Sequence, residues 1–294
     1  MKSLNWKEYS NGKLCKVHGM KKLPDVIYYD DPLRDEFSTA EITPKRIDDA
    51  YRYVYTGRWK QFTHFFWYRV VATPLAWLYL KLKFSHRIVN RAVLDQHRAD
   101  GYFLYGNHTQ AIADALIPTM IASPKDVYVI VHPNNVSMPV LGRITPSLGA
   151  LPLPDTLGAS RHFLAAVAQR VEEHHVLCIY PEAHIWPYYT GIRPFTDQSF
   201  HYPVRYNKPV YCFTNTYQQK KPGGKVRMVT YVDGPFYPDR SLKPREQQAK
   251  LRDAVYSTMT ARAANSNAVV VRYLPRAEEK KETPPPTGKD PYES

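Results

Sequence analysis

Three short, uninterrupted apolar runs most constrain the fold of this chain of 294 residues. They are VYVIV at 127–131, VLCIY at 176–180 and PVYCF at 209–213. Strands that are apolar on both faces belong to sheets that helices cover on both sides. Helical patterns lie between and after these runs, at 109–121, 160–174 and 244–263. The sequence therefore predicts an α/β fold with a mostly parallel sheet covered by helices.

The remaining segments are predicted less directly. We expect strands at 87–94 and 102–105 and edge strands at 226–232 and 269–274, and a short amphipathic helix at 47–58. The predicted organisation has three parts. They are an N-terminal polar segment with a membrane-interface helix over 1–85, an α/β domain over 86–275 and a disordered, proline-rich tail over 276–294.

The most apolar segment of the chain is FFWYRVVATPLAWLYLKL at 65–82. Its 18 residues are close to the minimum for a transmembrane helix, but Arg69 and Pro74 argue against a span. Between 58 and 98 there are eight basic residues and one acidic residue. A basic, aromatic and apolar helix is typical of a segment that lies in the membrane interface. A buried core helix with a basic rim, or a single span, remains as an alternative.

Charge and cysteine content limit the classes of function. Forty basic against 27 acidic residues give a net charge of +13, which indicates an anionic partner such as nucleic acid, an acidic substrate or a membrane surface. A nucleic-acid binder ranks low because no recognition motif is present. Three cysteines without a CxxC pair exclude a disulfide framework and a zinc ribbon. The N-terminus lacks an apolar signal-peptide stretch, so we expect no standard export.

Two corners of the predicted sheet carry chemical groups. His108 follows the strand at 102–105 and precedes a helix that contains Asp114, which is the arrangement of a base with an orienting acid. Glu182 follows the strand at 176–180. No GxSxG motif is present, so His108 would activate a hydroxyl that a substrate brings. Structural roles, a turn-capping histidine and a loop acid bonded to backbone amides, are the alternatives.

The ordered segments together resemble the glycerolipid (lysophosphatidic acid) acyltransferase family over about residues 88–216. They are Asn107-His108-x5-Asp114, the glycine-containing stretches MPVLG at 138–142 and LGALPL at 148–153, Tyr180-Pro181-Glu182, and Pro209-Val210. The resemblance implies a glycerolipid acyltransferase-like fold and direct acyl transfer to a lipid hydroxyl in phospholipid or glycolipid synthesis. It further implies that His108 acts as the base and that Asp114 orients it.

The resemblance also implies the partners of the site. We expect Asn107, Glu182, His184, Arg143 and Arg193 to bind substrate, and backbone amides near 106–107 or 181–184 to stabilise the oxyanion. The acyl donor would be acyl-CoA or acyl-ACP, a co-substrate and not a bound cofactor, and no metal is expected. Membrane lipids would be partners and nucleic acid would not. The expected location is the cytoplasmic face of the cell membrane, as a peripheral or monotopic protein.

Two departures from the family pattern qualify this expectation. Five residues, not four, separate His108 from Asp114, and one extra helical residue would rotate the acid by about 100°. A longer turn before the helix, or a π-bulge within it, would restore the contact. Two arginines that would hold an acceptor phosphate are also missing. Either Arg143, Arg161 or Arg193 substitutes for them, or the acceptor has a neutral head, such as a glycolipid or another lysolipid. The alternative function is a non-catalytic lipid-binding protein on the same fold.

Overall fold

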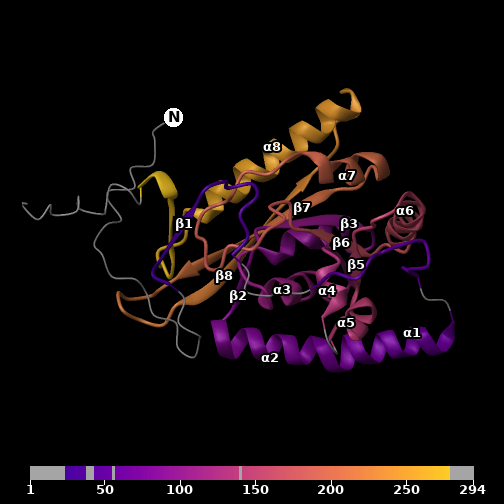
Figure 1. Ribbon diagram of the computed structural model, residues 1–294, viewed down its shortest axis with the longest axis horizontal. Coiled ribbons are helices and arrows are strands. Elements are labelled where there is room, and N and C mark those ends of the chain that lie inside the picture. The colour runs from indigo at the N-terminus through magenta and orange to yellow at the C-terminus, as the bar shows by residue number, and fades with distance from the viewer. Residues whose placement is uncertain (1–23, 38–42, 55–56, 139–140, 279–294) are drawn as a thin grey trace, which may run out of the picture.

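A seven-stranded sheet forms the centre of the protein (Figure 1). The computed structural model describes residues 24–37, 43–54, 57–138 and 141–278. The predicted tail beyond residue 278 therefore lies outside the described residues. The sheet order is β2-β8-β7-β3-β6-β4-β5. Its strands are β2 Arg87–Val89, β3 Tyr102–Gly106, β4 Val127–Val131, β5 Ala150–Pro152, β6 Val176–Ile179, β7 Val210–Gln218 and β8 Arg227–Phe236.

The sheet is mostly parallel, which confirms the predicted fold class. β3 lies between β6 and β7 and pairs in parallel with both, and β4 continues the parallel order from β6 to β5. β8 is antiparallel to β7, and β2 runs parallel to β8, so these two strands run opposite to the other five. The carboxyl ends of β3 and β6 therefore meet at one edge of the sheet, which places His108 and Glu182 side by side.

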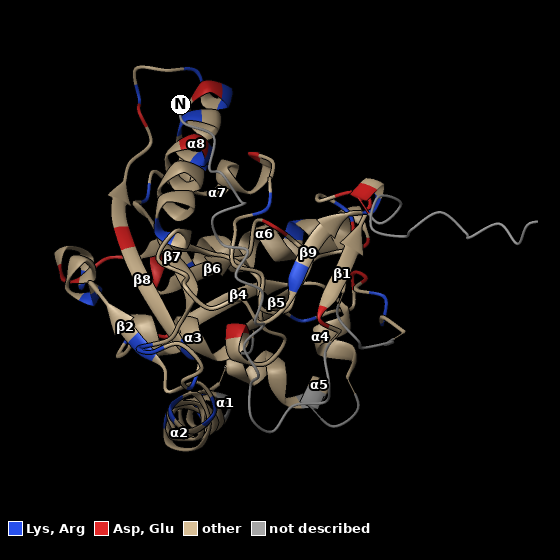
Figure 2. Cartoon of the chain, turned by 90° about the vertical axis from the view of Figure 1, so that its left-hand side faces the viewer, with Lys and Arg blue, Asp and Glu red and all other residues tan. Residues whose placement is uncertain are grey.

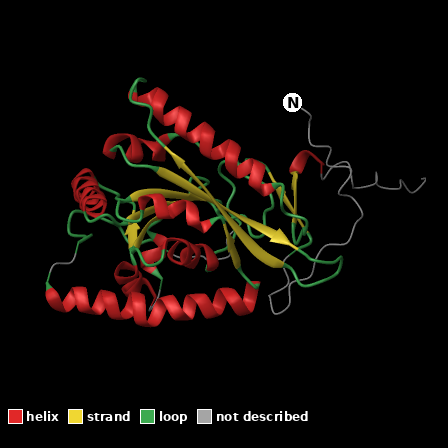
Figure 3. Cartoon of the chain, turned by 180° about the vertical axis from the view of Figure 1, so that it is seen from behind, coloured by secondary structure: helices red, strands yellow, loops and turns green. Residues whose placement is uncertain are grey.

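Helices cover both faces of the sheet (Figure 3). Phe103 and Tyr105 of β3 point into a core that includes residues of α6 Leu157–Glu172 and α8 Pro244–Ala263. Tyr102 and Leu104 point the other way, into a core with α3 Ala113–Ala122 and α2 Thr73–Phe84. Strands buried on both faces cannot alternate polar with apolar residues, which explains the continuous apolar runs. The shorter helices are α4 Asn134–Ser137, α5 Leu141–Ile144 and α7 His201–Tyr206.

Four local predictions need correction. The strand expected at 87–94 ends at Val89, because Asn90 has a left-handed backbone and a 3-10 helix, η3 Arg91–His97, follows. The helix expected from residue 109 begins at Ala113. The last strand, β9 Arg272–Pro275, does not join the main sheet but pairs with β1 Val26–Tyr29. Residues 47–54 form no helix, since Ile47 enters the core and its amide donates to Asp155.

One long helical rod lies along the α3 side of the domain (Figure 1). It consists of α1 Arg58–Phe65, a π-helical segment η2 Phe66–Ala72, and α2. Its 27 residues extend about 40 Å. The π-helical turns hold extra residues, so Tyr68 and Ala76, eight positions apart, both face the domain. None of the helices in the described part of the chain combines enough length and apolarity to pass through a bilayer.

Polar side chains fasten this rod to the domain. The Tyr68 hydroxyl lies 3.0 Å from the Thr119 hydroxyl and accepts from the Val127 amide at 2.9 Å. Arg69 forms a 2.5 Å ion pair with Asp126. Burial by itself would raise the pKa of Asp126, but the bond from His64 and the charge of Arg69 outweigh it and lower that pKa. Arg69, which argued against a span in the sequence, therefore serves as an attachment point.

The opposite side of the rod is apolar and exposed. Its large exposed side chains are Trp59, Phe62, Phe65, Phe66, Trp67, Val70, Leu75, Trp77, Leu78 and Leu82. Figure 2 looks along the rod, whose turns carry lysine and arginine but no acidic residue. An apolar surface of this extent on one element marks an interaction site.

Two leucines of α2 test which side of the rod holds the fold together. Leu80 is 1% exposed and Leu82 is 66% exposed. We expect Leu80→Ala to lower the free energy of unfolding by about 2–5 kcal/mol, because it leaves a cavity against α3. The matched Leu82→Ala should change it by less than about 0.5 kcal/mol. Urea titration measures both, and equal losses would contradict this packing.

Candidate active site

His108 and Asp114 form a hydrogen-bonded pair at the carboxyl end of β3. His108 Nδ1 lies 2.9 Å from Asp114 Oδ2, and Asp114 is fully buried. Residues 107–112 form an irregular turn, and α3 begins only at Ala113. The extra residue between histidine and aspartate is therefore absorbed before the helix, as the longer-turn alternative required. The pair that the sequence left uncertain is intact.

Asp114 accepts hydrogen bonds from four donors. Its Oδ2 accepts from His108 Nδ1 and from the amides of Thr109 and Gln110, both at 2.7 Å. Its Oδ1 accepts from Asn215 Nδ2 at 3.2 Å. Three of these donors are amide N–H groups, which donate whatever the histidine tautomer, and they favour a carboxylate, the form that only accepts. His108 therefore carries its proton on Nδ1, and its Nε2 is the atom that can take a proton from a ligand.

A chain of buried polar groups fixes the far side of this carboxylate. Thr230 Oγ1 donates to Asn215 Oδ1 at 2.6 Å. Because the hydroxyl has only one proton, Thr230 Oγ1 must accept from His86 Nε2, which lies 2.8 Å away. Burial lowers the pKa of His86 to about 4, which keeps it neutral and able to donate in this way. These three residues come from separate segments of the sequence, and no local sequence pattern indicates that they contact one another. Sequence reasoning missed all three.

Tyr180 determines the orientation of the imidazole. Its ring stacks on His108 with centroids 4.5 Å apart and 23° between the planes. Its hydroxyl donates to the backbone carbonyl of Asp114. Burial raises the pKa of Tyr180 well above its usual value, so this donor remains protonated. The His108 ring is thus held by a stacked face and one charged hydrogen bond.

Glu182 and Arg193 are buried beside His108, and their predicted role as substrate ligands needs correction. Glu182 Oε2 accepts from the His108 amide and Oε1 from the Arg193 amide, both at 3.1 Å. The Arg193 guanidinium lies 3.5 Å from Glu182 Oε2 and donates to the carbonyls of Glu182 and His184. Each side chain is 1% exposed. Burial raises the pKa of Glu182, and Arg193 opposes that rise. The pair therefore shapes the loops that carry His108.

The structure also locates the other three residues that were expected to bind substrate. Asn107 is 1% exposed and bonds the backbone of Asn215 in both directions, which makes it a structural link. His184 lies at the surface, 3.1 Å from Glu36. Arg143 belongs to α5, and its side chain lies outside the described residues. The amides of Ala183 and His184 donate within their own turn, so they are not available to an oxyanion.

The N-terminal segment holds the Glu182 loop from outside. Trp186 donates from its indole to the Asp35 carbonyl at 2.7 Å, and the Ile185 amide donates to Glu36. The Trp186 ring stacks on Tyr273 of β9 with centroids 4.8 Å apart. Nothing in the apparently irregular residues 1–56 indicated this contact. Residues 35–36 and β9 therefore both contact the loop that positions His108.

The site shows no sign of a metal centre. Within residues 24–37, 43–54, 57–138 and 141–278, no three His, Cys, Asp or Glu side chains gather as metal ligands. Both cysteines of this part, Cys178 and Cys212, are buried, and burial raises the pKa of each thiol well above its usual value. Such thiols are inert.

Comparison with known proteins finds similarity among solved structures. No family model and no curated protein matches the chain. Among solved structures, the chain is similar to the crystal structure of a 1-acyl-sn-glycerophosphate (LPA) acyltransferase, PlsC, from Thermotoga maritima. The two share 13% identity over 70% of this chain and 88% of that one, with a TM-score of 0.48. A similarity of this size assigns no activity, so the chemistry has to be argued from the site.

Removal of Glu182 tests whether it is structural. We expect Glu182→Ala to destabilise the fold by about 3–5 kcal/mol, because it leaves the Arg193 charge buried without its partner. Glu172→Ala, at an exposed position of α6, should change stability by less than about 0.5 kcal/mol. Urea unfolding followed by tryptophan fluorescence measures both. A Glu182→Ala protein as stable as the control would show that the carboxylate does not support the loop.

Proposed function

We propose that this protein transfers a fatty acyl chain from an acyl thioester to the hydroxyl of a lipid acceptor. The single observation that carries the proposal is the 2.9 Å contact between His108 Nδ1 and Asp114 Oδ2. This contact leaves Nε2 of a half-buried imidazole without a proton and supplies a buried negative charge behind it. That combination suits a general base.

The proposed reaction needs no covalent enzyme intermediate. His108 Nε2 takes the proton of the acceptor hydroxyl, and the hydroxyl oxygen attacks the thioester carbonyl carbon. The tetrahedral intermediate collapses, the carbon–sulfur bond breaks, and the thiolate leaves with the proton that Nε2 returns. Asp114 stabilises the imidazolium between the two proton transfers. The inert thiols of Cys178 and Cys212 support a nucleophile supplied by the substrate.

The motif order suggests the acyl donor, and the burial of Arg193 suggests the kind of acceptor. Acyl-CoA and acyl-ACP are the thioesters that the motif order suggests, either of which would be consumed as a co-substrate. Arg193, which the resemblance implies as a substrate ligand, is buried against Glu182 and donates to backbone carbonyls. This favours an acceptor whose reacting end carries no phosphate at the dyad, such as a glycolipid or a lysolipid that presents its hydroxyl first.

We further propose that the rod binds a membrane and brings the dyad to its lipid substrate. Ten large apolar side chains are exposed along one side of the rod, and basic residues with no acidic residue accompany them. Aromatic and apolar side chains with cationic neighbours fit the interface of an anionic bilayer. The protein would then act as a peripheral or monotopic enzyme at the cytoplasmic face of the membrane, with membrane lipids as partners.

The main alternative is a lipid-binding protein of the same fold without activity. Two features motivate it: the extra residue between His108 and Asp114, which would separate the dyad on a continuous helix, and the two missing arginines of the family pattern. The turn at 107–112 removes the first, since the two side chains are within hydrogen-bond distance. Catalysis is therefore favoured.

Two substitutions test catalysis. We expect His108→Ala and Asp114→Asn each to reduce acyl transfer by about 10²–10⁴-fold, the usual contribution of a positioned base. Asp253→Asn, at an exposed position of α8, should retain full activity. Thiol release from a long-chain acyl-CoA or acyl-ACP is measured with a panel of lysolipids and glycolipids. Undiminished transfer by a folded His108→Ala protein would exclude the mechanism. Lipid binding without turnover by the unaltered protein would favour the alternative.

Membrane contact by the rod is tested separately. Phe62→Ser with Trp77→Ser removes two large side chains, each worth about 1.5–3 kcal/mol when buried. We expect the double variant to partition onto phosphatidylcholine vesicles about 100-fold more weakly in a sedimentation assay. Leu33→Ser with Tyr237→Ser removes two exposed apolar side chains away from the rod and serves as the control. Equal behaviour of the two double variants would rule out the rod as the membrane surface.

A further inference from the structure

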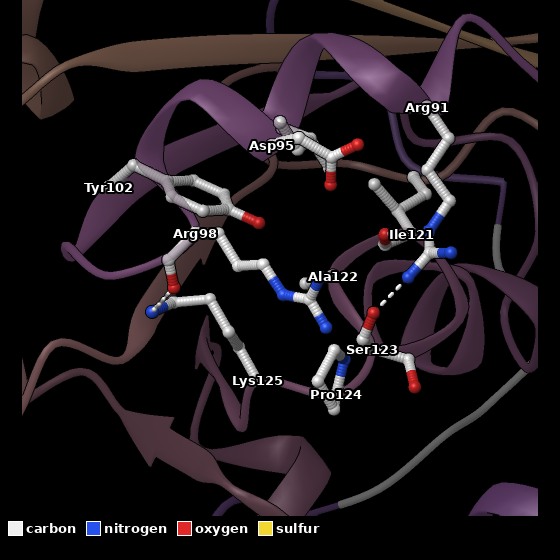
Figure 4. Close-up of a pocket in the computed structure, with 10 residues that line it drawn as sticks. Arg91, Asp95, Arg98, Tyr102, Ile121, Ala122, Ser123, Pro124 and Lys125 are labelled. Atoms are coloured by element: carbon white, nitrogen blue, oxygen red, sulfur yellow. Dashed lines mark hydrogen bonds between the residues drawn. The ribbon is translucent and has the colours of Figure 1, made fainter.

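Two hollows lie side by side at the end of β3 opposite to the dyad. The first, of about 320 Å³, lies between η3 and the end of α3 and is shown in Figure 4. The second, of about 440 Å³, opens between the rod and the end of α3. Arg91 and Ser123 line both hollows. Their volumes fall within the range of about 300–1,000 Å³ that is usual for ligand sites.

The first hollow is basic. Arg91, Arg98 and Lys125 line it together with one acid, Asp95. In Figure 4 the Arg98 guanidinium and the Tyr102 hydroxyl point into it. Lys125 Nζ donates to the Arg98 carbonyl at 3.1 Å, which uses one of its three protons. Guanidinium and ammonium groups that line one hollow and keep spare donors suit a phosphate or a similar anion.

Arg91 lines both hollows, and two hydrogen bonds hold its side chain in place. Its Nε donates to the Ile121 carbonyl at 2.8 Å, and its Nη2 donates to the Ser123 carbonyl (Figure 4). These carbonyls belong to the C-terminal end of α3, where a cation is favourable. The position of this arginine is thus fixed before any ligand arrives, which reduces the entropy lost on binding.

The second hollow is apolar and joins the exposed side of the rod. Thr73, Pro74 and Trp77 of the rod line it, with Met120 of α3 opposite. Trp77 is 59% exposed and belongs to the apolar surface described above. A ligand with an anionic head and an apolar chain would place the head among the cations and the chain along Trp77 and Met120.

We propose that these two hollows together bind an anionic phospholipid, with its phosphate beside Arg91, Arg98 and Lys125 and its acyl chain in the cleft beside Trp77. The proposal rests on the proposed membrane contact of the rod but not on catalysis. The site is distinct from the dyad, because Tyr102 and Gly106 mark opposite ends of β3, roughly 13 Å apart. It would fix the orientation of the enzyme on an anionic bilayer.

The first experiment compares vesicles of phosphatidylcholine with and without phosphatidylglycerol. We expect the protein to bind the mixed vesicles at least about tenfold more tightly, given about 1 kcal/mol for each basic residue at an anionic surface. Arg98→Glu and Lys125→Glu should each remove most of this preference and leave binding to neutral vesicles unchanged. Arg245→Glu, an exposed reversal of the same charge on α8, is the control for diffuse attraction.

A variant that is expected to bind more tightly serves as a control, because misfolding would weaken vesicle binding and not strengthen it. Asp95→Asn removes the one acid in the basic hollow, so it should tighten binding to mixed vesicles by several-fold. The inference is wrong if Arg98→Glu loses no more than Arg245→Glu, or if Asp95→Asn gives no gain.

Soluble ligands separate this inference from the proposed membrane contact. Dihexanoyl phosphatidylglycerol below its micelle concentration should bind the free protein and lose affinity in Arg98→Glu, even if the rod binds no neutral vesicle. Absence of that binding overturns the site. Glycerol phosphate and inorganic phosphate should bind at least about tenfold more weakly, because they leave the apolar cleft empty. Equal affinity would make the site one for free phosphate and would overturn its assignment to lipid.

Discussion

The buried carboxylate of Asp114 is the interaction on which the site depends. It lies at the start of α3, accepts four hydrogen bonds, and joins β7 to the turn that connects β3 with α3. A charge in such surroundings is tolerated only when every acceptor position is used, and here donors approach both oxygens. The same bonds that stabilise the charge also fix the proton on Nδ1 of His108. Structural need and the proposed chemistry are therefore met by one group.

Two loops bring this centre to the sheet edge, and both are held from outside. Glu182 accepts from the backbone amides of His108 and Arg193. Trp186 connects the Glu182 loop to the N-terminal segment and to β9. Catalytic groups need support of this kind to remain within a fraction of an ångström of their working positions. The rod lies on the other side of α3, so this helix separates the surface of the proposed membrane contact from the proposed chemistry.

The sequence predicted the groups of the site better than their roles. His108 and Asp114 follow from a strand, a histidine and a helix in order, and their distance confirms the pairing. The family resemblance implied that Glu182 and Arg193 bind substrate. The structure buries both, and a sequence does not reveal that two charges eleven positions apart neutralise each other in the interior. Asn215, Thr230 and His86 come from three separate segments and were not expected.

The sequence by itself determined the layers and the dyad, because apolar runs, helical periodicity and the order of motifs are local properties. It also indicated the apolar helix, although not its start at Arg58 or its attachment through Arg69. Tertiary structure decided whether five intervening residues permit the dyad, since the start of α3 depends on the donors that the folded turn offers to Asp114. It also decided which arginines are enclosed and which, such as Arg98, line an open hollow, because burial is a property of the assembled elements.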